Sequence, residues 1–328
     1  MMSARRPMPT RTAAALGAVA AMLLSFTPAA PTQAQVVALG STATGGTSQV
    51  GRELAAAVSN GSPVQMRPQE LANTADYIPL VNAGEMEFGI SNLVQYSYAV
   101  AGTGMSEGRP HPDLRMVAVL MPFRNNFIVR ADSGIEMLAD LKGKRMPMFP
   151  AGALGDHVVR GYLANAGMTV DDIVPVDVPN FPRMWASFGE GSTDVTIVVV
   201  GAGNSREFHA TLGGIRYLPL DPSDEAMARL QEWLPGAYAQ QLDASANIPG
   251  IDAPVHVNVF DYVLWASKDV SDEVVHAVTK ALYDQAEALA ASGPVWAGFE
   301  GARMALDVGS AYHPGAVAFY REVGVLAD

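Results

Sequence analysis

The feature that most constrains the fold is a predicted strand, turn and helix at residues 36–58. An apolar run at 36–39 predicts a buried strand, and apolar residues recur at helical spacing through 49–58. The turn between them, at 40–47, is rich in glycine and hydroxyl residues. Because the first backbone N–H groups of a helix have no partners inside it, such a turn can bind an anion. An ordinary turn with a threonine cap fits the same pattern.

The turn at 40–47 differs from the loops that bind nucleotide phosphates. No Gly-Lys-Ser/Thr follows it, and the G-x-G-x-x-G spacing of a dinucleotide site is absent. Gly45 and Gly46 can adopt positive φ and let a ligand approach the main chain. Thr44 or Thr47 can cap the helix or offer a hydroxyl. We therefore expect a carboxylate or another small oxyanion at this turn.

The same order of elements returns later in the chain. A strand predicted at 145–149 is followed by a turn with two glycines at 150–156 and by a helical pattern at 157–166. Between the two units we predict separate strands at 114–120 and 126–129. Two units of strand, turn and helix predict an α/β fold.

Polar or glycine residues also follow two other predicted strands. Ser91 and Asn92 come directly after residues 87–90, and Gly201 follows the β-branched run at 194–200. In open α/β sheets, ligands bind beyond the carboxyl ends of the strands. We therefore expect these residues to share a site with the turn at 40–47.

Residues 1–34 are predicted to be a secretion signal peptide. Three arginines precede an apolar stretch at 12–26, and small residues near Ala34 provide a cleavage site. The stretch is shorter than the roughly 20 residues that span a membrane, although a retained anchor helix is the alternative. We expect a soluble, monomeric protein in the periplasm.

Composition excludes several other classes of function. The formal net charge is −12, and loss of the three arginines with the signal peptide would make it −15, which disfavours nucleic acid as a partner. The chain has no cysteine, so disulfides and thiolate metal sites are excluded. The six histidines lack metal-binding spacing, and no G-x-S-x-G motif is present. We therefore expect no metal, no cofactor and no catalytic residues.

The chain resembles the TAXI solute receptors, which are the binding subunits of one class of TRAP transporters. Residues 37–47 resemble the first strand and G-x-x-T-G-G-T loop of that family, and residues 83–90 resemble its A-G-E-x-D-L-A-I segment. Residues 129–145 and the His-Pro-Gly-Ala at 313–316 follow in the same order. These four segments extend over nearly the whole chain after residue 34.

The resemblance implies a type II periplasmic-binding-protein fold with two α/β lobes, two crossover strands and a ligand cleft between the lobes. Lobe 1 would comprise 35–130 plus 258–328, and lobe 2 would comprise 131–257. It also implies an extracytoplasmic protein that captures a small organic carboxylate and delivers it to TRAP-type membrane permease subunits. The alternative is a ligand-sensing periplasmic protein that docks on a membrane signalling receptor, and an enzyme on the same fold is a third reading.

The resemblance also implies which residues hold the ligand. Where the family has Gly-Ser-Gly-Thr, this chain has glycine, Ala153, Leu154 and Gly155, whose side chains cannot donate, and Asp156 adds negative charge. We therefore expect a monocarboxylate, or a ligand with an apolar or cationic far end. The residues that would hold its carboxylate are Ser41, Thr42, Thr44, Gly45, Gly46 and Thr47, with Thr74, Ser91 and Asn92 beside them.

Two arginines are the charged residues best placed to assist. Arg124 and Arg183 each lie among aromatic residues, Phe181 being one of them, and a guanidinium binds carboxylates in bidentate fashion. The alternative is a surface arginine with packed neighbours. Asn126, at the predicted start of the first crossover, and Gly201 complete the predicted site.

Overall fold

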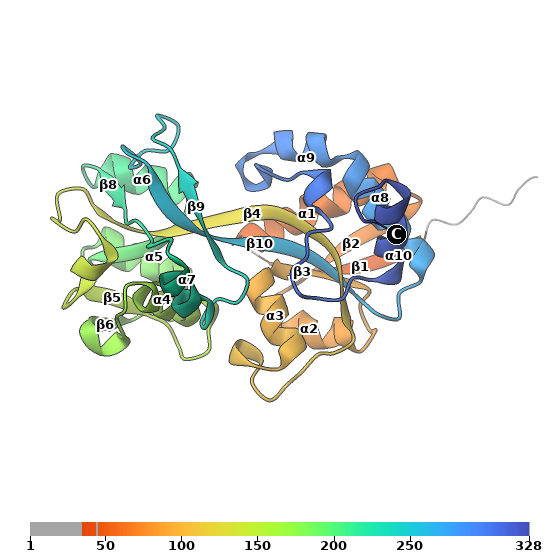
Figure 1. Cartoon of the computed structure of the whole chain (residues 1–328), viewed down its shortest axis with the longest axis horizontal. Helices are drawn as coiled ribbons and strands as arrows, with labels where there is room; N and C mark the ends of the chain where they lie inside the picture. Colours follow the sequence, from red (N-terminus) through yellow and green to blue (C-terminus); the bar gives the residue numbers. More distant parts are fainter. Residues whose placement is uncertain (1–34, 44, 328) are drawn as a thin grey trace, which may run out of the picture. The chain divides into compact units, whose positions relative to one another are not determined.

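A computed structural model describes residues 35–43 and 45–327 of the chain (Figure 1). The predicted signal peptide and Thr44 lie outside the described residues. Within the described part, no helix combines the length and the apolar composition that crossing a membrane requires.

The main sheet is mixed, with the strand order β2-β1-β3-β10-β4-β7 and with β8 and β9 paired to β4 and β10. Strands β1, β2 and β3 run parallel, whereas β10 is antiparallel to both β3 and β4. A second, parallel sheet contains only β5 and β6. The strands are β1 Gln35–Thr42, β2 Val64–Leu71, β3 Phe88–Asn92, β4 Leu114–Arg130, β5 Arg145–Met148, β6 Val174–Asp177, β7 Val195–Val199, β8 Ile215–Tyr217, β9 Tyr238–Leu242 and β10 Val255–Ser267.

Strands β4 and β10 connect the two sides of the molecule, and Figure 1 shows them side by side as the yellow and blue ribbons. The amino-terminal part of β4 pairs with β10, and its last residues pair with β7 and β8. In turn, β10 pairs with β9 near its start and with β3 near its end. We call the part around β1, β2 and β3 the β1–β3 side and the part around β5 to β9 the β5–β9 side.

The predicted break between two strands at 121–125 is wrong, because β4 continues through it. Phe123, Arg124 and Asn125 stay paired with β10. Pro122 lies next to a shift of register between Asp261 and its neighbours on β10, where a residue without a backbone N–H is tolerated. The chain therefore crosses as one long strand.

Helices cover both faces of the sheet on the β1–β3 side. On one face, Leu54, Leu282 and Phe319 bring α1, α8 and α10 into one apolar core with the sheet. On the other face, Tyr77 and Trp265 pack α2 against the strands with stacked rings 6.0 Å apart. The helices of the β1–β3 side are α1 Gly45–Gly61, α2 Thr74–Asn82, α3 Leu93–Ala101, α8 Asp272–Asp284, α9 Ala286–Ser292 and α10 Pro314–Glu322.

The β5–β9 side has its own cores. Phe127 of β4 stacks on Tyr162 of α4 with ring centroids 4.4 Å apart, and Phe188 of α5 packs edge-on against Phe208 of α6. The repeated strand–turn–helix unit and the α/β fold class are confirmed, since β1 leads into α1 and β5 into α4. The helices of the β5–β9 side are α4 Leu154–Asn165, α5 Phe181–Gly189, α6 Gly203–Thr211 and α7 Asp224–Gln231. Short 3-10 turns are distributed over both sides, at Gly104–Ser106, Leu138–Leu141, Val170–Asp172, Pro294–Trp296 and Gly301–Arg303.

A buried histidine begins the last helix. His313 is the N-cap of α10, and its Nδ1 accepts a hydrogen bond of 3.2 Å from the Gly315 N–H. Accepting that bond requires an unprotonated Nδ1. Burial lowers the pKa of His313, and the carboxylate of Asp272, 3.6 Å away, only partly opposes this.

We predict that His313 makes folding less favourable as the pH falls below about 6.5, the ordinary pKa of histidine. Below that pH the unfolded chain binds a proton that the folded chain does not, so the free energy of unfolding decreases by up to about 1.4 kcal/mol per pH unit. Thermal unfolding between about pH 7.5 and pH 5 should therefore show a smaller decrease in His313→Asn, which keeps an N-cap residue. Equal pH dependence in the two proteins would contradict this role.

Candidate ligand-binding site

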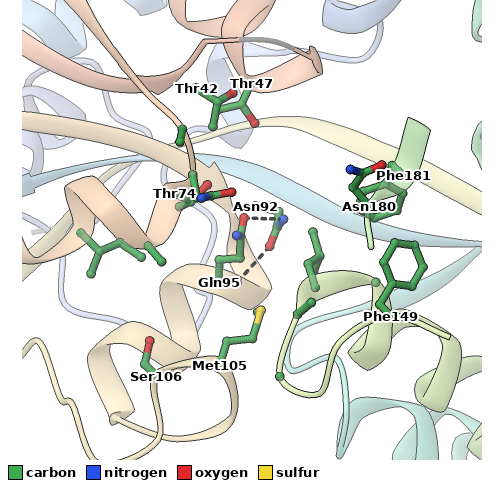
Figure 2. Close-up of a pocket in the computed structure, with 18 of the residues that line it drawn as sticks. Thr42, Thr47, Thr74, Asn92, Gln95, Met105, Ser106, Phe149, Asn180 and Phe181 are labelled. Carbon is green, nitrogen blue, oxygen red and sulfur yellow. Dashed lines mark hydrogen bonds between the residues drawn. The ribbon is translucent and has the colours of Figure 1, made fainter. Parts of the chain in front are cut away.

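A cavity of about 460 Å³ lies where five helices begin (Figure 2). Thr47 and Thr74 reach it from the first turns of α1 and α2, and Asn92 is the N-cap of α3. Across the cavity lie Leu154 of α4 and Asn180, the N-cap of α5. All five helices follow strands, so the cavity lies at the carboxyl ends of β1, β2, β3, β5 and β6.

The cavity is polar but its lining is uncharged. Among the described residues, no Asp, Glu, Lys, Arg or His side chain contributes to the lining. Each helix start carries a partial positive charge from its aligned peptide dipoles and unpaired N–H groups. The site therefore attracts electron-rich groups without using a cationic side chain.

The polar wall comes from the β1–β3 side and from β10. The hydroxyl of Thr47 lies 2.8 Å from that of Tyr262, which is buried. Burial raises the pKa of Tyr262, so the phenol is neutral at physiological pH. Asn92 Oδ1 accepts from the Gln95 N–H at 2.9 Å, and Asn92 Nδ2 donates to Gln95 Oε1 at 2.9 Å.

The opposite wall is mainly apolar and comes from the β5–β9 side. Phe149 and Phe181 lie with ring centroids 4.9 Å apart, and Leu154 lies beside them in the lining. Gly155, the second residue of α4, packs directly against the Phe149 ring, because a Cβ at this position would lie about 2.5 Å from it. The absence of a side chain at Gly155 therefore lets the start of α4 approach Phe149.

The charge expected beside the start of α4 is paired. Asp156 is buried and accepts hydrogen bonds from Arg160 Nε at 2.8 Å and from the Gly152 N–H at 3.3 Å. Asp156 is not among the residues that line the cavity. Its carboxylate instead partly neutralises the positive end of α4.

The structure brings several of the predicted site residues to this one cavity. Thr42, Thr47, Thr74, Asn92, Ala153, Leu154, Gly155 and Phe181 all line it. Gly45 and Gly46 begin α1 next to it, with Gly46 close to Phe123 and Tyr262.

Two predicted residues lie behind the wall. Ser41 is buried and donates to the Thr47 carbonyl at 3.1 Å. Ser91 is buried as well, and its hydroxyl accepts from the indole N–H of Trp265 at 3.1 Å. Both hydroxyls therefore hold the sheet and the first turn of α1 in place.

The structure does not bring the two arginines to this cavity. Arg124 Nε donates to Gln240 Oε1 at 2.7 Å, and the guanidinium of Arg183 is paired with Glu190 at 3.1 Å on the exposed side of α5. Arg124 lies close to Gln240 of β9 because β4 pairs with β10, and β10 pairs with β9.

Asn126 and Gly201 also lie outside the lining. Asn126 is buried and donates from Nδ2 to the Leu218 carbonyl at 2.7 Å. Gly201 has a positive φ after β7, and its backbone N–H donates to the Tyr217 hydroxyl at 3.4 Å. Both residues thus support the β5–β9 side.

The lining residues that sequence reasoning missed include five with aromatic or amide side chains. Asn180 carried a signal, because an asparagine directly before Phe-Pro is typical of a helix N-cap. Gln95 lies three residues after Asn92, the spacing at which the first turn of a helix meets its cap. Phe149 and Tyr262 lie within apolar runs and gave no such signal. The fifth residue, Asn73, precedes α2.

We predict that Gly155→Ala destabilises the protein, because the added Cβ must displace the Phe149 ring. Overpacking of this kind costs about 1–3 kcal/mol of unfolding free energy, measured by chemical denaturation. The matched control is Gly203→Ala in the first turn of α6, where a Cβ would meet nothing within 4 Å. Equal unfolding free energies for the two variants would show that the contact does not constrain Phe149.

Comparison with known proteins gives one family and several distant structures. A family model described as the NMT1-like family matches residues 39–324. The aliphatic sulphonate binding protein SsuA from Escherichia coli is 18% identical over 87% of this chain and 82% of its own, with a TM-score of 0.49. The alkanesulfonate-binding protein SsuA from Xanthomonas axonopodis pv. citri, bound to MOPS, is 16% identical over 89% and 80%, with a TM-score of 0.48. An ancestral arginine-binding protein bound to arginine is 13% identical over 78% and 94%, with a TM-score of 0.46.

Proposed function

The chain belongs to the NMT1-like family, and from its site we propose that it is a periplasmic solute-binding protein for a small organic monocarboxylate. The observation that carries this proposal is the uncharged cavity at the start of five helices. Helix N-termini bind carboxylates through backbone N–H groups. Thr74 and Ser106 line the cavity with hydroxyl groups, but within the described residues no His, Lys, Asp or Glu lines it beside them, so the lining favours capture of a solute over its conversion.

The acid group is best placed at α1. The first turns of α2 and α4 contain Asp76 and Asp156, whose charges offset the positive helix ends. The first turns of α1, α3 and α5 contain no acidic residue, but the side chains of Asn92 and Asn180 already cap α3 and α5. The hydroxyls of Thr47 and Tyr262 lie beside the first turn of α1, and because one donates to the other, the second hydroxyl supplies a further hydrogen-bond donor.

The rest of the ligand is best described as uncharged. Phe149, Phe181 and Leu154 face the polar wall, and within the described residues no lining side chain could pair with a second charge. Burying a second carboxylate without a partner would cost more than burying a hydrocarbon chain, which gains from contact with the rings. A monocarboxylate therefore fits this cavity better than a dicarboxylate does.

We also propose how the solute is delivered. Residues 35–130 with 258–328, and residues 131–257, would act as two lobes that close on the ligand by bending of β4 and β10. The closed form would then dock on a TRAP-type permease, as in the TAXI receptors that the sequence resembles. Hinge closure around a solute is a common way to signal occupancy.

Delivery can be tested with proteoliposomes that contain a TRAP-type permease of the class that TAXI receptors serve. We expect uptake of a radiolabelled monocarboxylate to require both the protein and an ion gradient. Binding without uptake, together with stimulation of a membrane signalling receptor, would contradict TRAP delivery and support the sensing alternative.

The acid-binding role of Thr47 gives a sharper prediction. Monocarboxylates from butanoate to octanoate should raise the melting temperature, because a ligand that binds only the folded state stabilises it. For the acid with the largest shift, Thr47→Val should weaken binding about tenfold or more, since a hydrogen bond to a charged group contributes about 1.5–3 kcal/mol. Isothermal titration calorimetry measures this.

The matched control is Thr211→Val on α6, whose exposed hydroxyl donates to the Glu207 carbonyl away from the cavity. This variant should bind like the unmodified protein. Undiminished affinity in Thr47→Val would remove the start of α1 from the site.

A further inference from the structure

Of the four amide side chains in the lining of the cavity, Gln95 and Asn180 lie on opposite walls (Figure 2). Gln95 belongs to α3 on the β1–β3 side, and Asn180 is the N-cap of α5 on the β5–β9 side. An amide can present either its oxygen or its NH₂ group to a ligand. The hydrogen bonds of each amide within the protein decide whether its oxygen or its NH₂ group is left for the ligand.

The orientation of Gln95 follows from a chain of two hydrogen bonds. The backbone N–H of Gln95 can only donate, so the atom of Asn92 that lies 2.9 Å from it must be the oxygen. The other end of Asn92 is then its NH₂ group, which donates to Gln95 Oε1 at 2.9 Å. Because the Gln95 oxygen is engaged in this way, its NH₂ group remains to serve the cavity.

The orientation of Asn180 follows in the same manner. The backbone N–H of Arg183 donates to Asn180 Oδ1 at 3.0 Å, which caps α5. Asn180 is exposed, and within the described residues its NH₂ group makes no hydrogen bond to the protein, so it is free to bind a ligand. Both walls of the cavity therefore offer an amide hydrogen-bond donor.

We propose that the ligand carries, in addition to its carboxylate, one uncharged carbonyl or ether oxygen that is held by Gln95 Nε2 and Asn180 Nδ2. This inference rests on the proposed function and names the class of monocarboxylate. Gln95 Nε2 and Asn180 Nδ2 are both donors. A ligand with an ammonium or another donor-only group at this position is rejected, because it would leave both amide NH₂ groups unpaired.

A second carboxylate is disfavoured for a different reason. Asp156 is buried in the first turn of α4, and its charge is balanced by Arg160. Arg160 does not line the cavity, and neither does any other cationic side chain of the described residues. A second anion on this side would therefore be buried without a counter-charge.

The position of the two donors also gives the oxygen a second role. Gln95 and Asn180 belong to opposite walls, so one ligand oxygen that accepts from both links the β1–β3 side to the β5–β9 side. In the proposed lobe closure, an acid without this oxygen would leave two amide donors unpaired in the closed cavity. Specificity and closure would thus depend on the same pair of hydrogen bonds.

Five acids with the same six-carbon chain test the proposal on the unmodified protein: hexanoate, 2-oxohexanoate, 5-oxohexanoate, norleucine and adipate. We expect one of the two oxo acids to bind about tenfold more tightly than hexanoate in calorimetry, since two neutral hydrogen bonds contribute that much. Norleucine, which adds an ammonium, and adipate, which adds a carboxylate, should bind more weakly than hexanoate.

The two amides are tested by near-isosteric substitutions. Gln95→Met removes the donor without adding charge, and Asn180→Asp replaces the donor with an acceptor but keeps an oxygen for the cap of α5. Each should reduce the preference for the oxo acid over hexanoate to less than about threefold, while hexanoate still binds. Gln69→Glu on β2, which is exposed and outside the cavity, is the control and should leave the preference unchanged.

The outcomes separate the two proposals. Equal binding of hexanoate and both oxo acids, or an oxo-acid preference that survives both substitutions, would overturn the role of the amide pair and leave monocarboxylate binding intact. Failure of all five acids to bind would overturn the proposed function and this inference with it.

Discussion

The site depends on a constraint of parallel strands. The chain must return from the carboxyl end of one strand to the amino-terminal end of the next, and here the connections contain helices. For that reason α1, α2, α3, α4 and α5 all begin at the carboxyl ends of the strands that precede them. Their unpaired N–H groups and positive dipole ends meet at one cavity. The electrostatic character of the cavity therefore arises from backbone topology, and side chains such as Asp156 only adjust it.

The second constraint is the continuity of β4 and β10. β10 pairs with β3 on the β1–β3 side and with β9 on the β5–β9 side, whereas β4 pairs with β7 on the β5–β9 side. The two strands also pair with each other, from 114–125 of β4 to 258–267 of β10. A relative movement of the two walls of the cavity has to be taken up by these strands. Pro122 and the shift of register at Asp261 lie within this stretch, where the ladder of hydrogen bonds is already interrupted. The proposed closure thus has a defined place at which to bend.

The fold could be predicted from the sequence because its signals are local. The apolar run before the glycine turn and the helical spacing after it are visible in residues 36–58, and the same holds around residue 150. The placement of Thr47 and Asn92 followed, since the carboxyl ends of parallel strands lie at the same end of a sheet. Leu154 was placed by the resemblance to the TAXI receptors. Tyr262 could not be found this way, because it reaches the cavity from a strand whose pairing partners are far away in the sequence. Likewise, the bond from Arg124 to Gln240 spans 116 positions and leaves no local pattern.

An uncharged site suits a protein with a formal net charge of −12. At long range this charge repels an anionic solute, and the repulsion is screened beyond about 8 Å at physiological ionic strength. Helix dipoles act only within their first turn, so they attract the acid group once it has entered the cavity. Amide and hydroxyl donors return to water at a modest cost when the ligand leaves, whereas a buried arginine would be left without its counter-charge. A cavity built from Thr47, Gln95 and Asn180 can therefore be emptied readily, and this is the property that the proposed role as a solute carrier requires at the membrane.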